Sequence, residues 1–186
     1  MTNINKEDIY FTNKAFHEFH SKLAWHLSDV FSNDLKTTYT FKKRRCINDQ
    51  KAIQSLSSTL LSHIYSIPFF CSLGSGYIVI DQSICINLSQ QLMGNPPKEN
   101  YTSSPILLEF MAHQLTQNIA NFDHEPISKT LNLDNAIHIE TDIQTHHLHG
   151  DHIVFQLQLL NDTNPIGHLY FIWPYLDTSH KTGGSL

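Results

Sequence analysis

Histidines are the residues of this 186-residue chain best suited to chemistry, and there are thirteen of them. The densest group of histidines and carboxylates comprises His138, Glu140, Asp142, His146, His147, His149, Asp151 and His152. Imidazole and carboxylate ligands suit zinc, and alternate residues of a strand share one face about 7 Å apart. The spacing matches neither HExxH nor a Cys/His knuckle, so we expect no native metal site. A histidine-rich metal-binding or pH-sensing module remains an alternative.

Nucleophilic catalysis has no matching motif either. Many Ser/His/Asp sets can be drawn from thirteen histidines, but the chain lacks a GxSxG elbow to select one. Of the three cysteines, Cys71 and Cys85 lie among apolar residues, which is typical of packed, unreactive thiols. The glycines at 74 and 76 fit no phosphate-binding motif. We therefore expect no enzyme activity and no cofactor.

The charge balance argues against nucleic acid as a general partner. Lys and Arg number 12 and Asp and Glu number 17, for a net charge of −5, whereas phosphate binding needs a basic excess. Four cations are nevertheless consecutive, from Lys42 to Arg45. They could bind a phosphate or an acidic partner, although a solvated strand end is the stronger expectation. No apolar run approaches the ~20 residues of a membrane helix, and no signal peptide is evident, so we expect a cytoplasmic protein.

Apolar residues three or four apart predict four helices, over residues 11–33, 49–61, 82–93 and 104–122. The third helix has Asp81 as its expected N-cap and ends at Gly94. Its expected buried stripe consists of Ile84, Leu88, Leu92 and Met93. The fourth begins with Ser104 as N-cap and Pro105 at the first helical position. Its expected buried residues are Leu107, Leu108, Met111, Leu115 and Ile119.

Alternating patterns predict the strands, over 35–45, 137–144, 153–159 and 166–173. A β-hairpin is predicted over 63–81, with its turn at 73–76, where glycines would supply positive φ. Three successive strands joined by turns read as an antiparallel meander. The chain is therefore predicted to be an α+β domain with a mainly antiparallel sheet, over 11–176, between flexible ends at 1–10 and 177–186.

Three stretches resemble the middle domain of the flagellar motor switch protein FliM and related type III secretion C-ring proteins. The first, SHIYSIPFFCSLGSGYIVIDQSICINLSQQLMGNPP, runs from Ser62 to Pro97, and the second, SPILLEFMAHQL, begins at Ser104. The third, from Gly167 to Tyr175, is similar to the family's closing strand. The order and spacing of these motifs extend the resemblance over roughly residues 10–176.

The resemblance implies a pseudo-symmetric α/β/α fold shared with the CheC-type phosphatases, and no enzyme activity. It implies partners that are FliG-like, FliN-like or other C-ring or secretion-platform proteins, self-association by side-by-side packing, and a cytoplasmic site at the inner membrane through a basal body. FliG contact would use the loop after the Gly-ended helix. That loop is Gly94, Asn95, Pro96 and Pro97 here, in place of Gly-Gly-x-Gly.

The function expected from the resemblance is that of a non-catalytic structural or adaptor protein. The family's acidic N-terminal peptide and FliN-like domain are not found, so we expect a middle-domain fragment, a diverged member or a stand-alone adaptor. A CheC-like response-regulator phosphatase is the alternative. Its pattern around Glu109 would require Pro105 and Ala112 as catalytic groups, and neither can serve. Gln114, Gln117 and Asn118 lack a correctly placed Glu.

Overall fold

The computed structural model describes residues 13–47, 64–71, 74–94, 104–125, 127, 131, 133 and 152–174. Several predicted features lie outside these residues: the chain ends and domain limits, the helix over 49–61, the strand over 137–144, and the histidine cluster apart from His152. Among the described helices, none is both long enough and apolar enough to cross a membrane.

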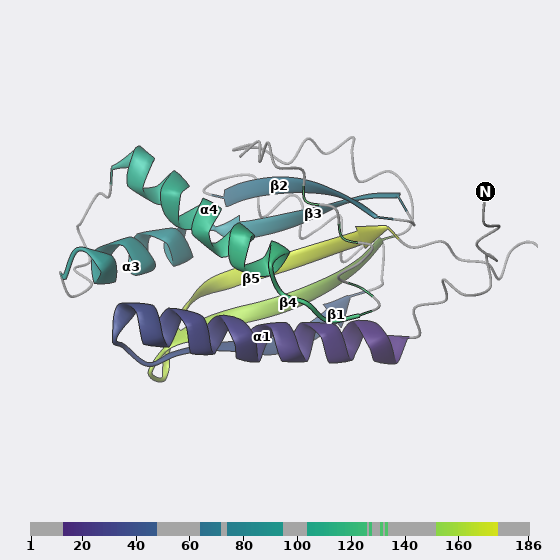
Figure 1. Cartoon of the computed structure of the whole chain (residues 1–186), viewed down its shortest axis with the longest axis horizontal. Helices are drawn as coiled ribbons and strands as arrows, with labels where there is room; N and C mark the ends of the chain where they lie inside the picture. Colours follow the sequence, from purple (N-terminus) through teal and green to yellow (C-terminus); the bar gives the residue numbers. More distant parts are fainter. Residues whose placement is uncertain are drawn as a thin grey trace, which may run out of the picture.

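One antiparallel sheet organises the described part of the chain (Figure 1). Its strands are β1 (Tyr39–Ile47), β2 (Ile64–Cys71), β3 (Gly74–Asp81), β4 (His152–Asn161) and β5 (Asn164–Pro174). They lie in the order β1-β4-β5-β3-β2, and every neighbouring pair is antiparallel. The predicted α+β class with a mainly antiparallel sheet is confirmed.

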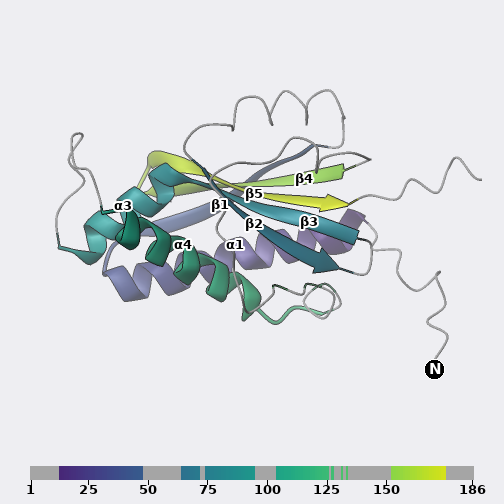
Figure 2. The same ribbon diagram turned by 90° about the horizontal axis from the view of Figure 1, so that it is seen from above.

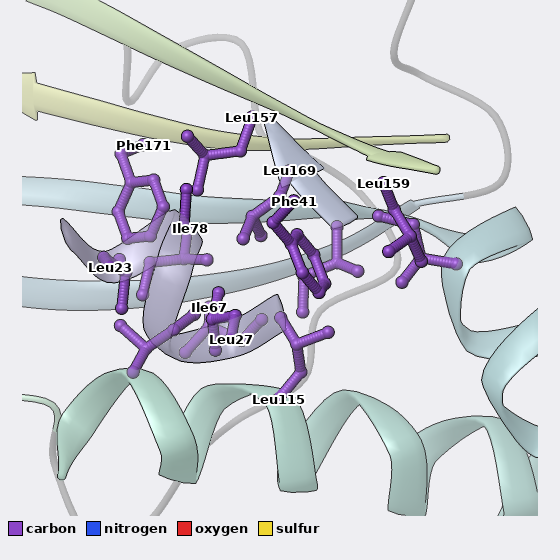
Figure 3. Packing of buried hydrophobic residues seen from close by; sticks show 14 of the residues in the cluster. Leu23, Leu27, Phe41, Ile67, Ile78, Leu115, Leu157, Leu159, Leu169 and Phe171 are labelled. Atoms are coloured by element: carbon purple, nitrogen blue, oxygen red, sulfur yellow. The ribbon is translucent and has the colours of Figure 1, made fainter. Parts of the chain in front are cut away.

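Three helices, α1 (Asn13–Leu35), α3 (Gln82–Leu92) and α4 (Pro105–Ala120), lie on one face of this sheet (Figure 2). Their buried side chains and those of the facing strands form the main core. Figure 3 shows Leu23 and Leu27 of α1 and Leu115 of α4 close to sheet residues such as Ile67 and Ile78. A smaller buried cluster on the opposite face comprises Ile47, Ile64, Tyr77, Val79, Val154, Tyr170 and Ile172. Only one layer of the implied α/β/α fold is thus built from described helices.

Helix α1 protects the edge strand β1. The backbone N–H of Phe41 donates to Ser28 Oγ at 2.7 Å, and that of Tyr39 donates to Ser32 Oγ at 2.9 Å. Residues four apart share one helix face, so both serines point at the strand. Exposed edges otherwise recruit foreign strands. The predicted start of this strand at Leu35 is wrong, because α1 extends to that residue before the chain turns at Lys36, with φ +54°.

The β2–β3 hairpin turns earlier than predicted. Gly74 and Gly76 belong to β3, opposite Cys71 and Phe69, so the turn comes before them. Gly74 does adopt a positive φ of 135°. Gly76 serves a different purpose. A Cβ there would lie 2.3 Å from Phe69 Cζ and 2.5 Å from the carbonyl oxygen of Ile172, so only glycine fits without a shift of the sheet.

Gly76→Ala is expected to lower the free energy of unfolding by roughly 1–3 kcal/mol, because β5 backbone cannot move away without losing ladder hydrogen bonds. Ser75→Ala, at the exposed neighbouring position, is the control and is expected to change it by less than about 0.5 kcal/mol. Urea denaturation of the two variants provides the comparison. Equal stability of the two would show that the strand has room for a methyl group at 76.

The helix starts also differ in detail from the predictions. Asp81 is at the N-cap of α3, but its side chain makes no capping bond. Its Oδ2 instead accepts the backbone N–H of His168 at 2.6 Å, which ties β3 to β5. Ser104 precedes Pro105 at the start of α4 as predicted, again without a side-chain cap. Its carbonyl oxygen accepts the N–H groups of Leu107 and Leu108, at 3.0 and 3.1 Å.

Candidate protein-docking site

The described histidines do not assemble a metal centre. No group of three His, Cys, Asp or Glu residues that could hold an ion occurs in the described ranges. His152, the described member of the predicted cluster, is buried at the start of β4. The other members lie outside the described residues, so the metal-binding and pH-sensing alternative stays a prediction.

The most buried of the described histidines, His20, has a structural role. His20 Nδ1 lies 2.7 Å from the carbonyl oxygen of Phe16, and its Nε2 accepts the indole N–H of Trp173 at 3.1 Å. The ring stacks on Phe155, with centroids 4.0 Å apart. A carbonyl oxygen can only accept and an indole N–H can only donate, so the ring is neutral with its proton on Nδ1. Burial lowers the pKa of His20 from 6.5 to about 3, and neither nitrogen is available as a ligand or base.

The cysteines are packed as predicted rather than activated. Cys85 is fully buried, and burial raises the pKa of its thiol to about 12, so almost no thiolate forms at neutral pH. Burial also raises the pKa of Cys46. Cys71 is half-buried at the end of β2 and packs against the main core. Nucleophilic chemistry needs an exposed, electropositive setting for the thiolate, which Cys85 does not have.

The residues of the phosphatase alternative lie along α4. Ala112 is buried in the core, while Glu109 is exposed. The side-chain amide of Asn118 donates to the carbonyl oxygen of Gln114 at 2.9 Å, within its own helix. These positions do not supply the carboxylate and amide pair that would orient a water molecule.

Exposed apolar side chains are concentrated at the junction of α3 and α4. Six large hydrophobic residues in the described ranges are exposed, and four of them come from the last turn of α3 and the first turns of α4. Their exposed fractions are 50% for Leu92, 55% for Met93, 79% for Ile106 and 46% for Phe110. These two helix ends lie at the same end of the molecule (Figure 1), and we call the four residues the α3–α4 corner.

Hydrogen bonds hold helix α3, which carries part of the corner, against other elements of the domain. The hydroxyl of Tyr39 donates to Asn87 Oδ1 at 2.8 Å, and Gln91 Nε2 donates to the carbonyl oxygen of Leu35 at 3.4 Å. These bonds fix α3 to the connection between α1 and β1. Helices α3 and α4 also pack against each other. The exposed side chains are therefore displayed by rigid elements, as a binding surface requires.

Sequence reasoning misplaced half of this surface. Leu92 and Met93 were predicted to be buried with Ile84 and Leu88, but they are 50% and 55% exposed. The last turn of α3 is buried through Ser89 and Gln90 instead. The detectable signal lay in α4. Its start, Pro-Ile-Leu-Leu-Glu-Phe-Met, holds five large apolar residues within two turns, and a single buried face cannot cover all of them.

The predicted contact loop adjoins the corner. Gly94 is exposed and ends α3 with φ +68°, a conformation that glycine adopts readily. Asn95, Pro96 and Pro97 lie outside the described residues. The assignment of this loop to partner binding therefore stays a prediction.

Comparison with solved structures identifies the fold. A chain of the FliG-FliM complex from H. pylori matches with a TM-score of 0.64 and 18% identity, over 92% of this chain and 94% of that chain. The FliM middle domain from H. pylori matches with 0.57 and 17%, over 87% and 90%. FliY from Thermotoga maritima matches with 0.64 and 13%, over 89% and 92%. The described architecture is thus the FliM middle-domain fold. No family model and no curated protein sequence matches the chain.

Proposed function

We propose that this chain is a non-catalytic structural or adaptor subunit of a flagellar switch, which acts through contacts with other proteins. The fold likeness to FliM and FliY, over about nine-tenths of the chain, supports the placement. A cytoplasmic location beside the inner membrane, within a flagellar basal body or a type III secretion platform, belongs to the same proposal.

The α3–α4 corner is the observation that carries this proposal. Large apolar side chains that are exposed together on one part of a domain commonly mark a protein-binding site. Removing apolar area from water is favourable by about 25 cal/mol per Å² before the entropic cost of association is subtracted. Leu92, Met93, Ile106 and Phe110 supply four large side chains, and aromatic and methionine residues are enriched in interface cores. Gly94 and the predicted contact loop adjoin them.

A FliG-like protein is the proposed occupant of the corner. One of the similar solved structures is a complex of FliG with FliM. The match covers 92% of this chain and 94% of the matched chain. FliN-like proteins and a second copy of this chain are further proposed neighbours in the ring. The proposal requires no reactive group, which agrees with the buried, fully bonded state of His20 and the packed state of Cys85.

Ile106→Asp is expected to weaken capture of the FliG-like partner at least about tenfold, because the partner would have to bury an unpaired carboxylate. The measurement is a pull-down from native cells, with the recovered switch proteins quantified by mass spectrometry. Thr163→Asp adds the same charge at an exposed position in the β4–β5 turn and serves as control. Equal capture by both variants, or capture of no switch protein by the unaltered chain, would contradict the proposal.

A further inference from the structure

The face of the sheet opposite the helices carries a concentration of positive charge at β1. Regular strands send consecutive side chains to opposite faces. The register between β1 and β4 shifts between Lys43 and Arg45, which leaves Arg44 as the extra residue of a bulge. Arg44 and Arg45 consequently both reach side chains of β4 that share one face, Gln158 and Gln156.

Lys42 belongs to the same group, while Lys43 does not. Lys42 lies opposite Gln158 in the register, so its side chain is on the face of the two arginines. Lys43 points to the helix side, where its Nζ lies 3.2 Å from His17 Nδ1 and donates to the carbonyl oxygen of His17 at 3.3 Å. Three exposed cations, Lys42, Arg44 and Arg45, thus form one cluster, which we call the β1 basic face.

Two glutamines hold the arginines in place. Arg45 Nε donates to Gln156 Oε1 at 2.9 Å, and Arg44 Nε donates to Gln158 Oε1 at 2.5 Å. Gln156 is itself buried and directs its amide toward the hydroxyl of Tyr170, 3.5 Å away. Within the described residues both guanidinium groups are bound through Nε alone, so that their terminal amino groups remain for a ligand. Neither arginine forms an ion pair with any residue in the described ranges.

We propose that the β1 basic face docks an acidic, carboxylate-rich segment of a partner protein. An oriented guanidinium matches a carboxylate with two parallel hydrogen bonds, which makes arginine the preferred residue for such contacts. The net charge of −5 repels a long polyanion such as nucleic acid. A short acidic segment contacts only the local cations and avoids that repulsion. Exposed aromatic side chains, on which bases would stack, are absent from described β1 residues.

The mode of contact follows from the neighbouring helix. The hydroxyl oxygens of Ser28 and Ser32 already accept hydrogen bonds from outward-pointing N–H groups of β1. The partner therefore contacts side chains of β1 and does not pair with its backbone as an added strand. The surface lies on the far side of the sheet from the helices and their corner. It is a second interaction site, separate from the proposed FliG-like contact. An experiment that contradicts one of the two proposals therefore leaves the other standing.

Binding of a fluorescein-labelled peptide of alternating Glu and Ser, followed by anisotropy at low salt, tests the proposal. The double variant Arg44→Gln, Arg45→Gln is expected to weaken binding roughly tenfold or more. The control, Lys14→Gln with Lys22→Gln, removes the same charge from exposed positions of α1 and is expected to weaken it less than about twofold. No binding by the unaltered chain, or equal losses in both doubles, would overturn the proposal.

A further variant separates the effect of holding the Arg44 side chain in place from the effect of its charge. Gln158→Leu keeps every cation but removes the acceptor that holds Arg44, and it is expected to weaken peptide binding about threefold. Undiminished affinity would overturn the role of the bulge and the glutamines. Tighter binding of a labelled oligothymidylate than of the peptide would overturn the choice of carboxylates. Circular dichroism spectra verify that each variant is folded.

Discussion

Replacing Leu115 with Asp is expected to unfold the domain. The side chain lies at the centre of the core face of α4, fully buried, and packs toward α1 and the sheet (Figure 3). A carboxylate there would lose its hydration without gaining a partner, at an expected cost of about 4 kcal/mol or more. Native domains are stable by roughly 5–15 kcal/mol, so a loss of this size removes most of the stability at the lower end of that range. Ile80→Asp, at an equally buried position of β3, is expected to behave alike.

Ile106→Asp is the matched control, since it introduces the same residue into the same helix at a position that is 79% exposed. It is expected to shift the free energy of unfolding by less than about 0.5 kcal/mol. Thermal denaturation followed by far-ultraviolet circular dichroism distinguishes the two variants. A cooperative transition for Leu115→Asp close to that of the unaltered chain would show that α4 does not pack as described.

The stability of the domain is expected to fall as the pH drops below 6.5. Above that pH, His20 is neutral in both folded and unfolded states, and it makes no difference to the proton balance. Below it, the unfolded chain takes up a proton that the folded chain refuses, because burial holds the pKa of the folded state at about 3. Folding stability is therefore lost between those two pH values, by about 2 kcal/mol for His20 alone at about pH 5.

His20→Gln isolates this contribution. The variant is expected to be less stable at neutral pH, since Trp173 and Phe16 lose their partners, but to lose less stability on acidification. His17 supplies a smaller slope of the same sign, because burial and Lys43 lower its pKa. Urea denaturation at several pH values compares the variant with the unaltered chain, and identical slopes would exclude His20 as the cause.

Periodicity predicted the helices and strands of the described residues well, because it reflects burial directly. The apolar spacing from Phe16 to Phe31 specified α1, and Gly94 marked the end of α3. The failures come from long-range contacts that local patterns do not contain. Asp81 was predicted to cap a helix, but its carboxylate accepts a hydrogen bond from the backbone N–H of His168, which is distant in the sequence. Gly76 looked like a turn residue, but the ring of Phe69 and the backbone of β5 require it.

The candidate surfaces were less predictable than the core. Leu92 and Ile106 have the same apolar character as their buried neighbours Leu88 and Leu108, and only the packing of the whole domain decides which of them is covered. The run from Lys42 to Arg45 was visible as charge and was expected to be a solvated strand end. The bulge that turns Arg44 and Arg45 to one face depends on the register with β4, which a single strand does not encode.

Site-specific photocrosslinking in living cells tests most directly whether the chain works as a docking subunit. A crosslinking amino acid at position 106, in the α3–α4 corner, is predicted to capture a FliG-like switch protein, identified by mass spectrometry. The same probe at position 163, in the exposed β4–β5 turn, is predicted not to do so. Capture of that protein from 163 but not from 106, or from neither position, would contradict the account.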